Sequence, residues 1–354
     1  MGNSTAKRIA EAIRQEIADG RHRPGVALPP VAALRKRFGA GDFAVRHALH
    51  TLRDEGLVSV TKHVGAVVSA KAAFAWKGHV ALVHSSVSGS YYTMRFSIRL
   101  LRRLEADGWT THPIFLEAQP DGWLNTEPLM RHVAGGGLSF AIVSSEFRQI
   151  VEILDRAAVP YVVVNGYARD FPNARAVIRE SASGCYADLI RALKERGLKT
   201  IHEFDFNRRM DRSFKGQLTT AGIRLRSTLC KWDNERENLL SEVRECGYRA
   251  VSDFLADSAN RAHLPDVILF DDDYLAGGGI AAIMKAGLRI PGDIRVVTHS
   301  NKGNEAVLGF SLARIENDPV ASADTVADYV LAQLDGRSVA VPRMKLRYVP
   351  GESL

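Results

Sequence analysis

Apolar and polar positions between residues 28 and 68 follow two successive spacings. Two stretches repeat apolar residues at helical intervals on either side of a break at 39–41: Val31, Leu34 and Phe38, then Val45, Ala48, Leu49 and Leu52. Gly56 ends the second stretch, and two short apolar runs, Leu57–Val60 and Ala66–Val68, flank a polar turn. This order predicts two short helices at a steep angle and a β-hairpin, which together form a winged helix–turn–helix. A stripe at Ile9, Ile13 and Ile17 predicts one further helix before it.

From residue 79 onward, short apolar runs alternate with amphipathic helical stretches. The runs predict strands over residues 79–84, 111–116, 138–144, 159–166, 176–178, 199–204, 224–229, 267–270 and 294–298. The stretches between them predict helices over residues 93–107, 126–134, 147–157, 184–196, 209–221, 237–255 and 274–286. Such alternation is typical of α/β folds with parallel sheets and helices on both faces, whose ligands bind at the carboxyl ends of the strands. We therefore expect a winged helix over residues 1–69, a linker over 70–78 and a ligand-sensing body over 79–354.

Charge is concentrated at the beginning of the chain. Residues 1–75 contain 12 lysines and arginines against 6 aspartates and glutamates, and the whole chain of 354 residues has a net charge of only +7. A basic module on a nearly neutral body is typical of a protein that binds phosphates through the module alone. The alternative is an ordinary solvated basic surface.

The remaining composition argues against several other classes of protein. The three cysteines lie far apart without CxxC spacing, which makes disulfides and a structural zinc site unexpected: Cys185, Cys230 and Cys246. No apolar run reaches the ~18 residues that a membrane span requires. The N-terminal stretch is an amphipathic helix without a signal-peptide core. We therefore expect a cytoplasmic protein with no membrane contact.

Enzyme motifs are absent apart from one acidic run. The sequence contains no dinucleotide fingerprint, P-loop, HExxH or GxSxG motif. Asp271, Asp272 and Asp273 end an expected strand, where they could hold Mg²⁺, accept hydrogen bonds from ligand hydroxyls or cap the next helix. Trp232 could stack on a sugar or pack at a rim, and Asn165 could be a ligand group or a turn residue.

The stretch over residues 1–68 resembles the GntR-type winged helix. The matching positions include Ile13, Ile17, Gly20, Pro24-Gly25, Leu28-Pro29, Leu34, Phe38-Gly39, Val45-Arg46, Ala48-Leu49, Leu52, Glu55–Val58, Gly65 and Val68. The outer face of the second helix of the motif and the wing are therefore expected to contact DNA, through Arg35, Phe43, Ala44, Arg46, His47, His50, Lys62, His63 and Gly65. The start of that helix departs from the family, because Gly41-Asp42-Phe43-Ala44 replaces the usual Ser/Thr-Arg-Thr-Thr, and Asp42 would repel phosphate.

The body resembles the LacI/GalR type of periplasmic-binding-protein-like sensor domain. The resemblance is carried by residues 159–166, 273–297 and 313–336. It implies two lobes, which we expect at 79–166 plus 299–322 and at 167–298 plus 323–354. It also implies a sugar-like effector, with expected contacts at Ser85, Tyr91, Asn165, Arg212, Ser213, Trp232, Asp273 and Asn301. Ser213 stands where the family has a sugar-binding arginine, and residues 298–301 lack its Gly-x-Asp-Asp pattern.

These features together predict a ligand-responsive transcriptional regulator, most simply a repressor. We expect a homodimer that binds a pseudo-palindromic double-stranded operator, with no catalytic residue, metal or cofactor. The competing hypothesis is an α/β enzyme or pure sensor that acts on a nucleotide-sugar or phosphate through residues 271–273 and carries a degenerate winged helix.

Overall fold

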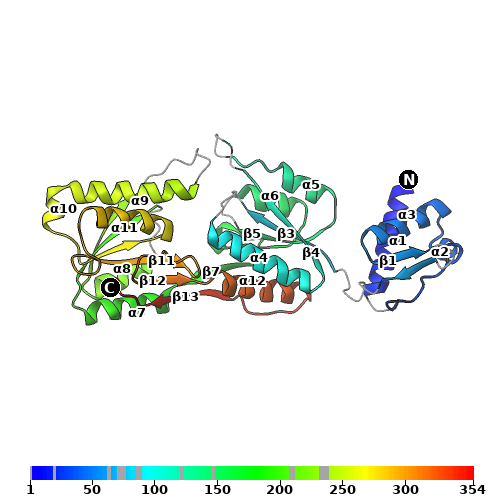
Figure 1. Ribbon diagram of the computed structural model, residues 1–354. Coiled ribbons are helices and arrows are strands. Elements are labelled where there is room, and N and C mark those ends of the chain that lie inside the picture. The colour runs from blue at the N-terminus through cyan, green and yellow to red at the C-terminus, as the bar shows by residue number, and fades with distance from the viewer. Residues whose placement is uncertain are drawn as a thin grey trace. The chain divides into compact units, whose positions relative to one another are not determined.

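The computed structural model describes residues 2–18, 21–61, 65–69, 77–84, 90–117, 119, 123–144, 148–206, 212–230 and 239–354 (Figure 1). Contacts divide the chain into two compact units. The first unit comprises residues 1–81, 102–112 and 132–140, and the second comprises the rest. No helix in the described part of the chain is long and apolar enough to cross a membrane.

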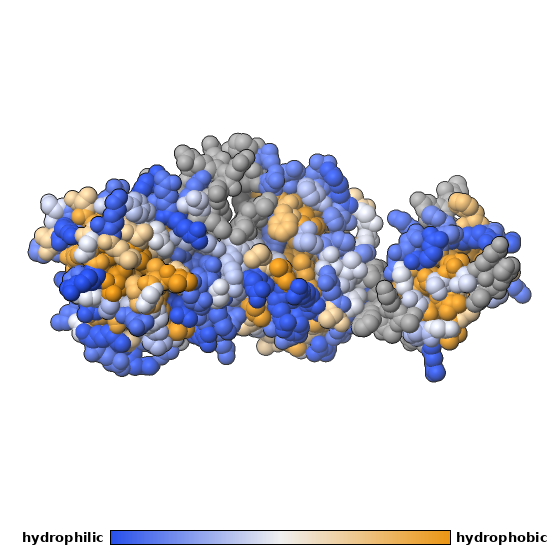
Figure 2. Space-filling model, in the orientation of Figure 1, coloured by the Kyte–Doolittle hydropathy of each residue, from blue (hydrophilic) through white to orange (hydrophobic). Residues whose placement is uncertain are grey.

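The N-terminal part of the chain, up to Ser69, forms the predicted winged helix. Its elements are α1 (Gly2–Ala18), α2 (Val31–Phe38), α3 (Asp42–Asp54), β1 (Val58–Thr61) and β2 (Gly65–Val68). The apolar stripes of the three helices meet in one buried core, which includes Ile9, Ile13, Leu34, Val45 and Leu52. β1 and β2 pair antiparallel, with Val58 opposite Val68, and so form the wing. Figure 2 shows hydrophilic residues around the rim of this domain and apolar residues towards its middle.

The body is the expected α/β structure. Its strands are β3 (Gly78–His84), β4 (Trp109–Phe115), β5 (Leu138–Ser144), β6 (Tyr161–Val164), β7 (Ala176–Ser181), β8 (Thr200–Asp205), β9 (Arg224–Leu229), β10 (Val267–Phe270), β11 (Arg295–Asn301), β12 (Ala313–Asn317) and β13 (Arg343–Val349). Its helices are α4 (Tyr91–Ala106), α5 (Glu127–Ala134), α6 (Arg148–Arg156), α7 (Ser183–Glu195), α8 (Arg212–Thr220), α9 (Leu239–Ala256), α10 (Ser258–Ala262), α11 (Asp273–Lys285) and α12 (Pro319–Leu334), with a short 3₁₀ helix at Ala168–Asp170.

Hydrogen bonds join the eleven strands in the order β4-β3-β5-β6-β7-β13-β12-β11-β10-β8-β9. The strand pairs from β5 to β7 and from β12 through β9 are parallel, as the alternation predicted. β13 was not predicted: it pairs parallel with β7 and antiparallel with β12, and thereby connects the two halves of the sheet.

Alternating side chains of the second half-sheet enter two separate cores. Leu269 packs on the side of α7 and α8, whereas Ile268 packs with α9 and α11. α9 and α11 approach closely because glycines line their contact: a Cβ on Gly278 would collide with the backbone of Arg244, and one on Gly247 with the backbone of Leu275. Gly278 is therefore required for packing, and so is Gly279, where a Cβ would collide with the Phe270 ring, whereas a Cβ at Gly277 would meet open space.

The contacts of α12 favour a different division of the body into lobes from the one expected. Arg99 of α4 donates to Asp324 at 2.8 and 3.1 Å, and the Tyr329 hydroxyl donates to the Arg175 carbonyl oxygen at 3.4 Å. α12 thus contacts elements of the first half, while β11 and β12 extend the sheet of β10. We therefore propose residues 318–342, in place of 299–322, as the returning segment of the first lobe.

Candidate DNA interface and ligand site

Helix α3 presents a polar face to solvent because its apolar residues face the core at helical spacing. It begins after Gly41, whose φ of −72° and ψ of 160° are non-helical, and Asp42 occupies its first turn. Four of the residues expected to contact DNA are exposed on this helix: Phe43, Arg46, His47 and His50. Arg35 on α2 and Gly65 at the start of β2 are exposed as well.

Ala44 is the exception among the expected DNA contacts. Its side chain is 8% exposed and belongs to the core of the domain. Ala44 follows Phe43 by one residue, and a step of about 100° along the helix turns its side chain inward beside Val45. The side chain of Ala44 therefore packs in the core, and its expected contact with DNA stays a prediction.

Charged and aromatic side chains pair with one another at the start of α3. Arg46 Nε donates to Asp42 Oδ2 at 2.6 Å, and Arg35 Nη1 lies 3.8 Å from Asp42 Oδ1. The hydrogen bond from Arg46 holds the pKa of the Asp42 carboxyl below its ordinary value. The rings of Phe43 and His47 stack at 6.1 Å with an interplanar angle of 6°. The exposed face is therefore an ordered arrangement of side chains.

Several expected contacts lie outside the described residues. They are Lys62 and His63 in the wing, together with Ser85 and Trp232 in the body. Arg212 begins α8, but its side chain also lies outside the described part.

The three consecutive aspartates of the body have three different roles. The Phe206 N–H donates to Asp271 at 3.1 Å. Asp272 is the N-cap of α11 and accepts from the backbone of Tyr274 and Leu275 at 2.8 and 3.1 Å. Asp273 lines a pocket. Within the described ranges, no group of three or more His, Cys, Asp or Glu residues is arranged to hold a metal ion.

Asp273 is held by the loop that follows β11. Its Oδ2 accepts from the backbone and side-chain amides of Asn301 at 3.0 and 3.1 Å, and from Asn304 Nδ2 at 3.1 Å. Its other oxygen, Oδ1, is buried and has no hydrogen-bond partner among the described residues. Asp273 lines a cavity of about 100 Å³ whose other polar lining residues are Thr298, Ser300, Asn304, Glu305, Ser311 and Arg314. This cavity therefore offers a fixed acceptor to a hydroxyl or amine.

Polar side chains continue from this point across the strand ends. Asn301 is paired in register with Asn317 on β12. Asn317 Nδ2 donates to Glu180 Oε1 at 2.7 Å, and Asn165 also hydrogen-bonds to Glu180. Burial raises the pKa of Glu180. The structure thus brings the expected ligand residues Asp273, Asn301 and Asn165 into one row of polar side chains. The other two members of this row, Asn317 and Glu180, were not predicted from the sequence.

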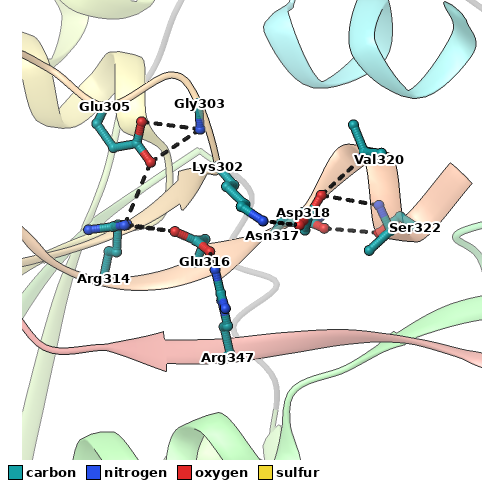
Figure 3. Close-up of polar contacts among 11 residues, drawn as sticks. Lys302, Gly303, Glu305, Arg314, Glu316, Asn317, Asp318, Val320, Ser322 and Arg347 are labelled. Atoms are coloured by element: carbon teal, nitrogen blue, oxygen red, sulfur yellow. Dashed lines mark hydrogen bonds and ion pairs between the residues drawn. The ribbon is translucent and has the colours of Figure 1, made fainter. Parts of the chain in front are cut away.

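Ion pairs and hydrogen bonds connect the strands and the loop that carry this row of polar side chains (Figure 3). Glu316 on β12 is 1% exposed and accepts from Arg314 Nε and Nη2 at 3.0 and 2.8 Å, while Arg347 of β13 binds its other oxygen. Arg314 also lies 3.6 Å from Glu305 in an ion pair. Lys302 donates to Asp318, the N-cap of α12, at 2.7 Å. The loop after β11 is therefore tied to the strands on which it rests.

Two further expected ligand residues lie in different surroundings. The Tyr91 N–H donates to the Tyr274 hydroxyl at 3.1 Å, and the Tyr91 hydroxyl lies so close to Gly303 that a Cβ there would collide with it. Tyr91 is therefore close to the loop that holds Asp273. Ser213, at the start of α8, accepts from Gln217 Nε2 at 3.1 Å.

A second acidic group, outside the expected ligand residues, lies on β8. Glu203 is 3% exposed and its Oε2 has no partner among the described residues. Burial, together with the nearby Asp205 and Asp271, raises the pKa of Glu203 to about 8. Burial likewise raises the pKa of Asp271 to about 7 and lowers that of His299 to about 4. In the sequence, His202-Glu203 begins a metalloprotease-like string, but Phe206 stands where the second histidine would be, so the sequence assigned no role to Glu203.

Two protein families match separate parts of the chain. Residues 5–68 match the family of bacterial regulatory proteins called the gntR family, and residues 190–354 match the periplasmic binding protein-like domain. A comparison with curated protein sequences gives no match.

Solved structures share the fold of the body at low sequence identity. A LacI family transcriptional regulator from Arthrobacter sp. FB24 in complex with lactose is 18% identical with a TM-score of 0.61, over 78% of this chain and 98% of that one. A LacI family regulator from Enterococcus faecium with bound ribose is 14% identical with a TM-score of 0.60, over 78% and 98%. The lac repressor dimer bound to operator and an anti-inducer is 17% identical with a TM-score of 0.61, over 77% and 93%. The chain therefore combines a helix–turn–helix domain of the gntR family with a periplasmic-binding-protein-like body of the LacI-type fold.

Proposed function

We propose that this chain is a ligand-responsive transcriptional repressor whose effector is a sugar or a similar polyhydroxylated molecule. It acts as a homodimer on a pseudo-palindromic operator, because a dimer with two-fold symmetry presents two identical recognition helices to two half-sites. The effector can change the affinity for DNA only to the extent that it binds one arrangement of the body more tightly than another.

The DNA-binding part of the proposal rests on α3. Arg46 and Phe43 are exposed on a helix whose opposite face is the core of the domain, as a helix that enters a major groove requires. The basic charge of the stretch 1–75 supplies the attraction to phosphates.

The ligand-binding part rests above all on the unpartnered oxygen of Asp273. A buried carboxylate oxygen without a donor is costly, and a ligand hydroxyl supplies the missing hydrogen bond. Asn301 and Asn304 hold the carboxylate in place, so it does not need to rearrange when the ligand enters. Solved proteins of this fold carry lactose and ribose, which fits a ligand of the same class.

A thermal-shift screen tests the choice of ligand. The full-length chain is heated with each member of a carbohydrate library and, as the control, with nucleotides and sugar phosphates. A sugar that binds the folded state raises the unfolding temperature by an amount that grows with its concentration relative to its Kd. A shift with nucleotides alone, or turnover that requires Mg²⁺, would favour the enzyme hypothesis.

Retention of DNA tests the regulator separately. The chain is expected to enrich specific duplexes from a randomised pool at ~150 mM salt, where purely electrostatic binding is weak. Addition of a sugar identified by the screen should then release them. Enrichment of no sequence would contradict the regulator.

A further inference from the structure

The start of α3 has an acid where a DNA-reading helix would be expected to have a base. Charge alone suggests that Asp42 repels the phosphate backbone and weakens binding. Its contacts suggest another role, because each carboxylate oxygen faces a different arginine: Oδ2 lies 2.6 Å from Arg46 Nε, and Oδ1 lies 3.8 Å from Arg35 Nη1. The two arginines come from different helices of the motif.

We propose that Asp42 is a specificity-determining residue that orients Arg46 to read a guanine in the major groove. This inference rests on the proposed DNA-binding function. It adds guanine as the base that Arg46 contacts and Asp42 as the residue that orients Arg46.

The geometry of the guanidinium group supports this role. The bond to Asp42 engages Nε, the inner nitrogen of Arg46, and the side chain is still 63% exposed. The two terminal nitrogens therefore remain available as a fork of parallel donors. Guanine presents O6 and N7 as two neighbouring acceptors in the major groove, which match this fork. An arginine whose direction is set in advance loses less conformational freedom on binding and selects more sharply.

The neighbouring aromatic pair supports the same direction of approach. Phe43 is 78% exposed and its ring stacks on that of His47, one turn further along the helix. Both lie beside the Asp42–Arg46 pair, so the exposed start of α3 presents an ordered charged pair and an ordered apolar ring together. An apolar ring in the major groove contacts the methyl group of thymine. The surface as a whole therefore fits base edges rather than phosphates alone.

The test compares base preference with overall affinity. Full-length wild type, Asp42→Ala, Asp42→Asn and Arg46→Ala are each mixed with a randomised duplex pool, and the bound DNA is sequenced. Asp54→Ala is the matched control, because Asp54 forms an exposed pair with Arg53 at the other end of the same helix. Removal of either acid raises affinity for unselected DNA by the same charge effect.

Of the two acids, only Asp42 should also affect the discrimination between bases when it is removed. We expect the wild type to enrich a guanine in each half-site and Arg46→Ala to lose that preference. Asp42→Ala should reduce the preference for guanine over the other bases about tenfold, a factor within the range of one good arginine–guanine pair. Asp42→Asn should restore part of it, since the amide oxygen still accepts from Nε.

Three results would overturn the proposal. An unchanged guanine preference in Asp42→Ala would leave Asp42 as a repulsive charge only. Loss of a cytosine preference, with the guanine of Arg46 retained, would show that Asp42 itself reads a base. A wild-type chain that enriches no sequence would contradict both this inference and the proposed function. The first two results would contradict this inference alone, so the two failures can be distinguished.

Discussion

The winged helix and the body hold their charged side chains in opposite ways. At the start of α3, Asp42 and Arg46 pair in solvent, where a DNA phosphate or base can replace or join either partner. In the body, Glu316 and Glu203 are almost wholly buried, one bound by two arginines and the other beside further acids. Exposed pairs stabilise a fold by only a few tenths of a kcal/mol to about 1 kcal/mol, whereas the loss of a buried partner costs several. We infer that the proposed DNA surface keeps its charges available for a partner, whereas Glu316 uses its charge to hold Arg314, which lines the pocket.

The sharpest contrast is expected in the response to pH. Burial raises the pKa of Glu203 to about 8, so the folded body favours its protonated form. The stability that protonated Glu203 contributes to the body is fully present below pH 4.5, the ordinary pKa of a glutamate. It is lost as the pH rises through the raised pKa of about 8. In the winged helix, hydrogen bonds from Arg37 and Arg46 lower the pKa values of Glu16 and Asp42. The stability that these groups contribute is present at neutral pH and is lost as the pH falls through their lowered pKa values.

Calorimetry of the full chain between pH 5 and 8 checks this prediction. We expect the transition temperature of Glu203→Gln, relative to that of the wild type, to increase as the pH rises, because only the wild type loses the contribution of the protonated Glu203. The effect of this one group reaches up to about 5 kcal/mol at full ionisation, because one pKa unit corresponds to about 1.4 kcal/mol. Asp253→Asn, an exposed change on α9, is the control. Parallel curves for Glu203→Gln and wild type would contradict the prediction.

The next largest effect is expected at Glu316. Replacement by alanine leaves Arg314, whose side chain is 17% exposed, without its buried partner. We expect the free energy of unfolding of the body to decrease by about 3 kcal/mol, as measured by urea denaturation. Glu305→Ala breaks the looser 3.6 Å pair with the same arginine and should cost below about 1 kcal/mol. Equal effects of the two variants would mean that burial does not distinguish these pairs.

Arg46→Ala should act on DNA binding and leave the fold intact. Its exposed side chain makes no core contact, so the unfolding temperature should stay the same, while specific binding weakens by roughly 1–3 kcal/mol. Fluorescence anisotropy with the enriched duplex measures the loss. Arg53→Ala, at the far end of α3, is the matched control and should mainly reduce salt-sensitive affinity. Full affinity in a folded Arg46→Ala protein would exclude the residue from the interface.

The smallest expected effect concerns the ligand. Asp273→Asn keeps the shape of the side chain but removes its charge, so affinity for a sugar found in the screen should fall at least about tenfold, or 1.4 kcal/mol. Asp272→Asn is the control, because asparagine caps a helix about as well as aspartate. Titration calorimetry with and without EDTA measures both variants. Loss of binding in EDTA would favour a metal over the proposed hydrogen bond.

The winged helix could be predicted from sequence because its signals are local. Each helix buries one stripe, and the left-handed Gly39, with a φ of 59°, ends α2 where the pattern breaks. Ala44 shows the limit of the resemblance, since a residue that was expected to contact DNA has its side chain in the core. Its neighbours Val45 and Ala48 are buried on the same side of the helix.

The ligand row could be predicted only in part, because it is assembled from distant strands. Asp273 follows an apolar run and was recognisable at once. Glu180 on β7 and Asn317 on β12 form a hydrogen bond across β13, which lies between these two strands in the sheet. No local pattern in the sequence indicates this contact. The division into lobes that we propose could not be predicted for the same reason, since a partner of α12 lies far earlier in the chain, at Arg99.

The position of β13 between β7 and β12 also has a consequence for biosynthesis. The strand Arg343–Val349 is synthesised after both strands that it joins, so β7 and β12 must wait with open edges until it emerges from the ribosome. The winged helix, whose core residues all lie between Ala6 and Val68, can fold long before. A nascent or prematurely terminated chain would therefore carry a finished DNA-binding domain on an unfinished, aggregation-prone body.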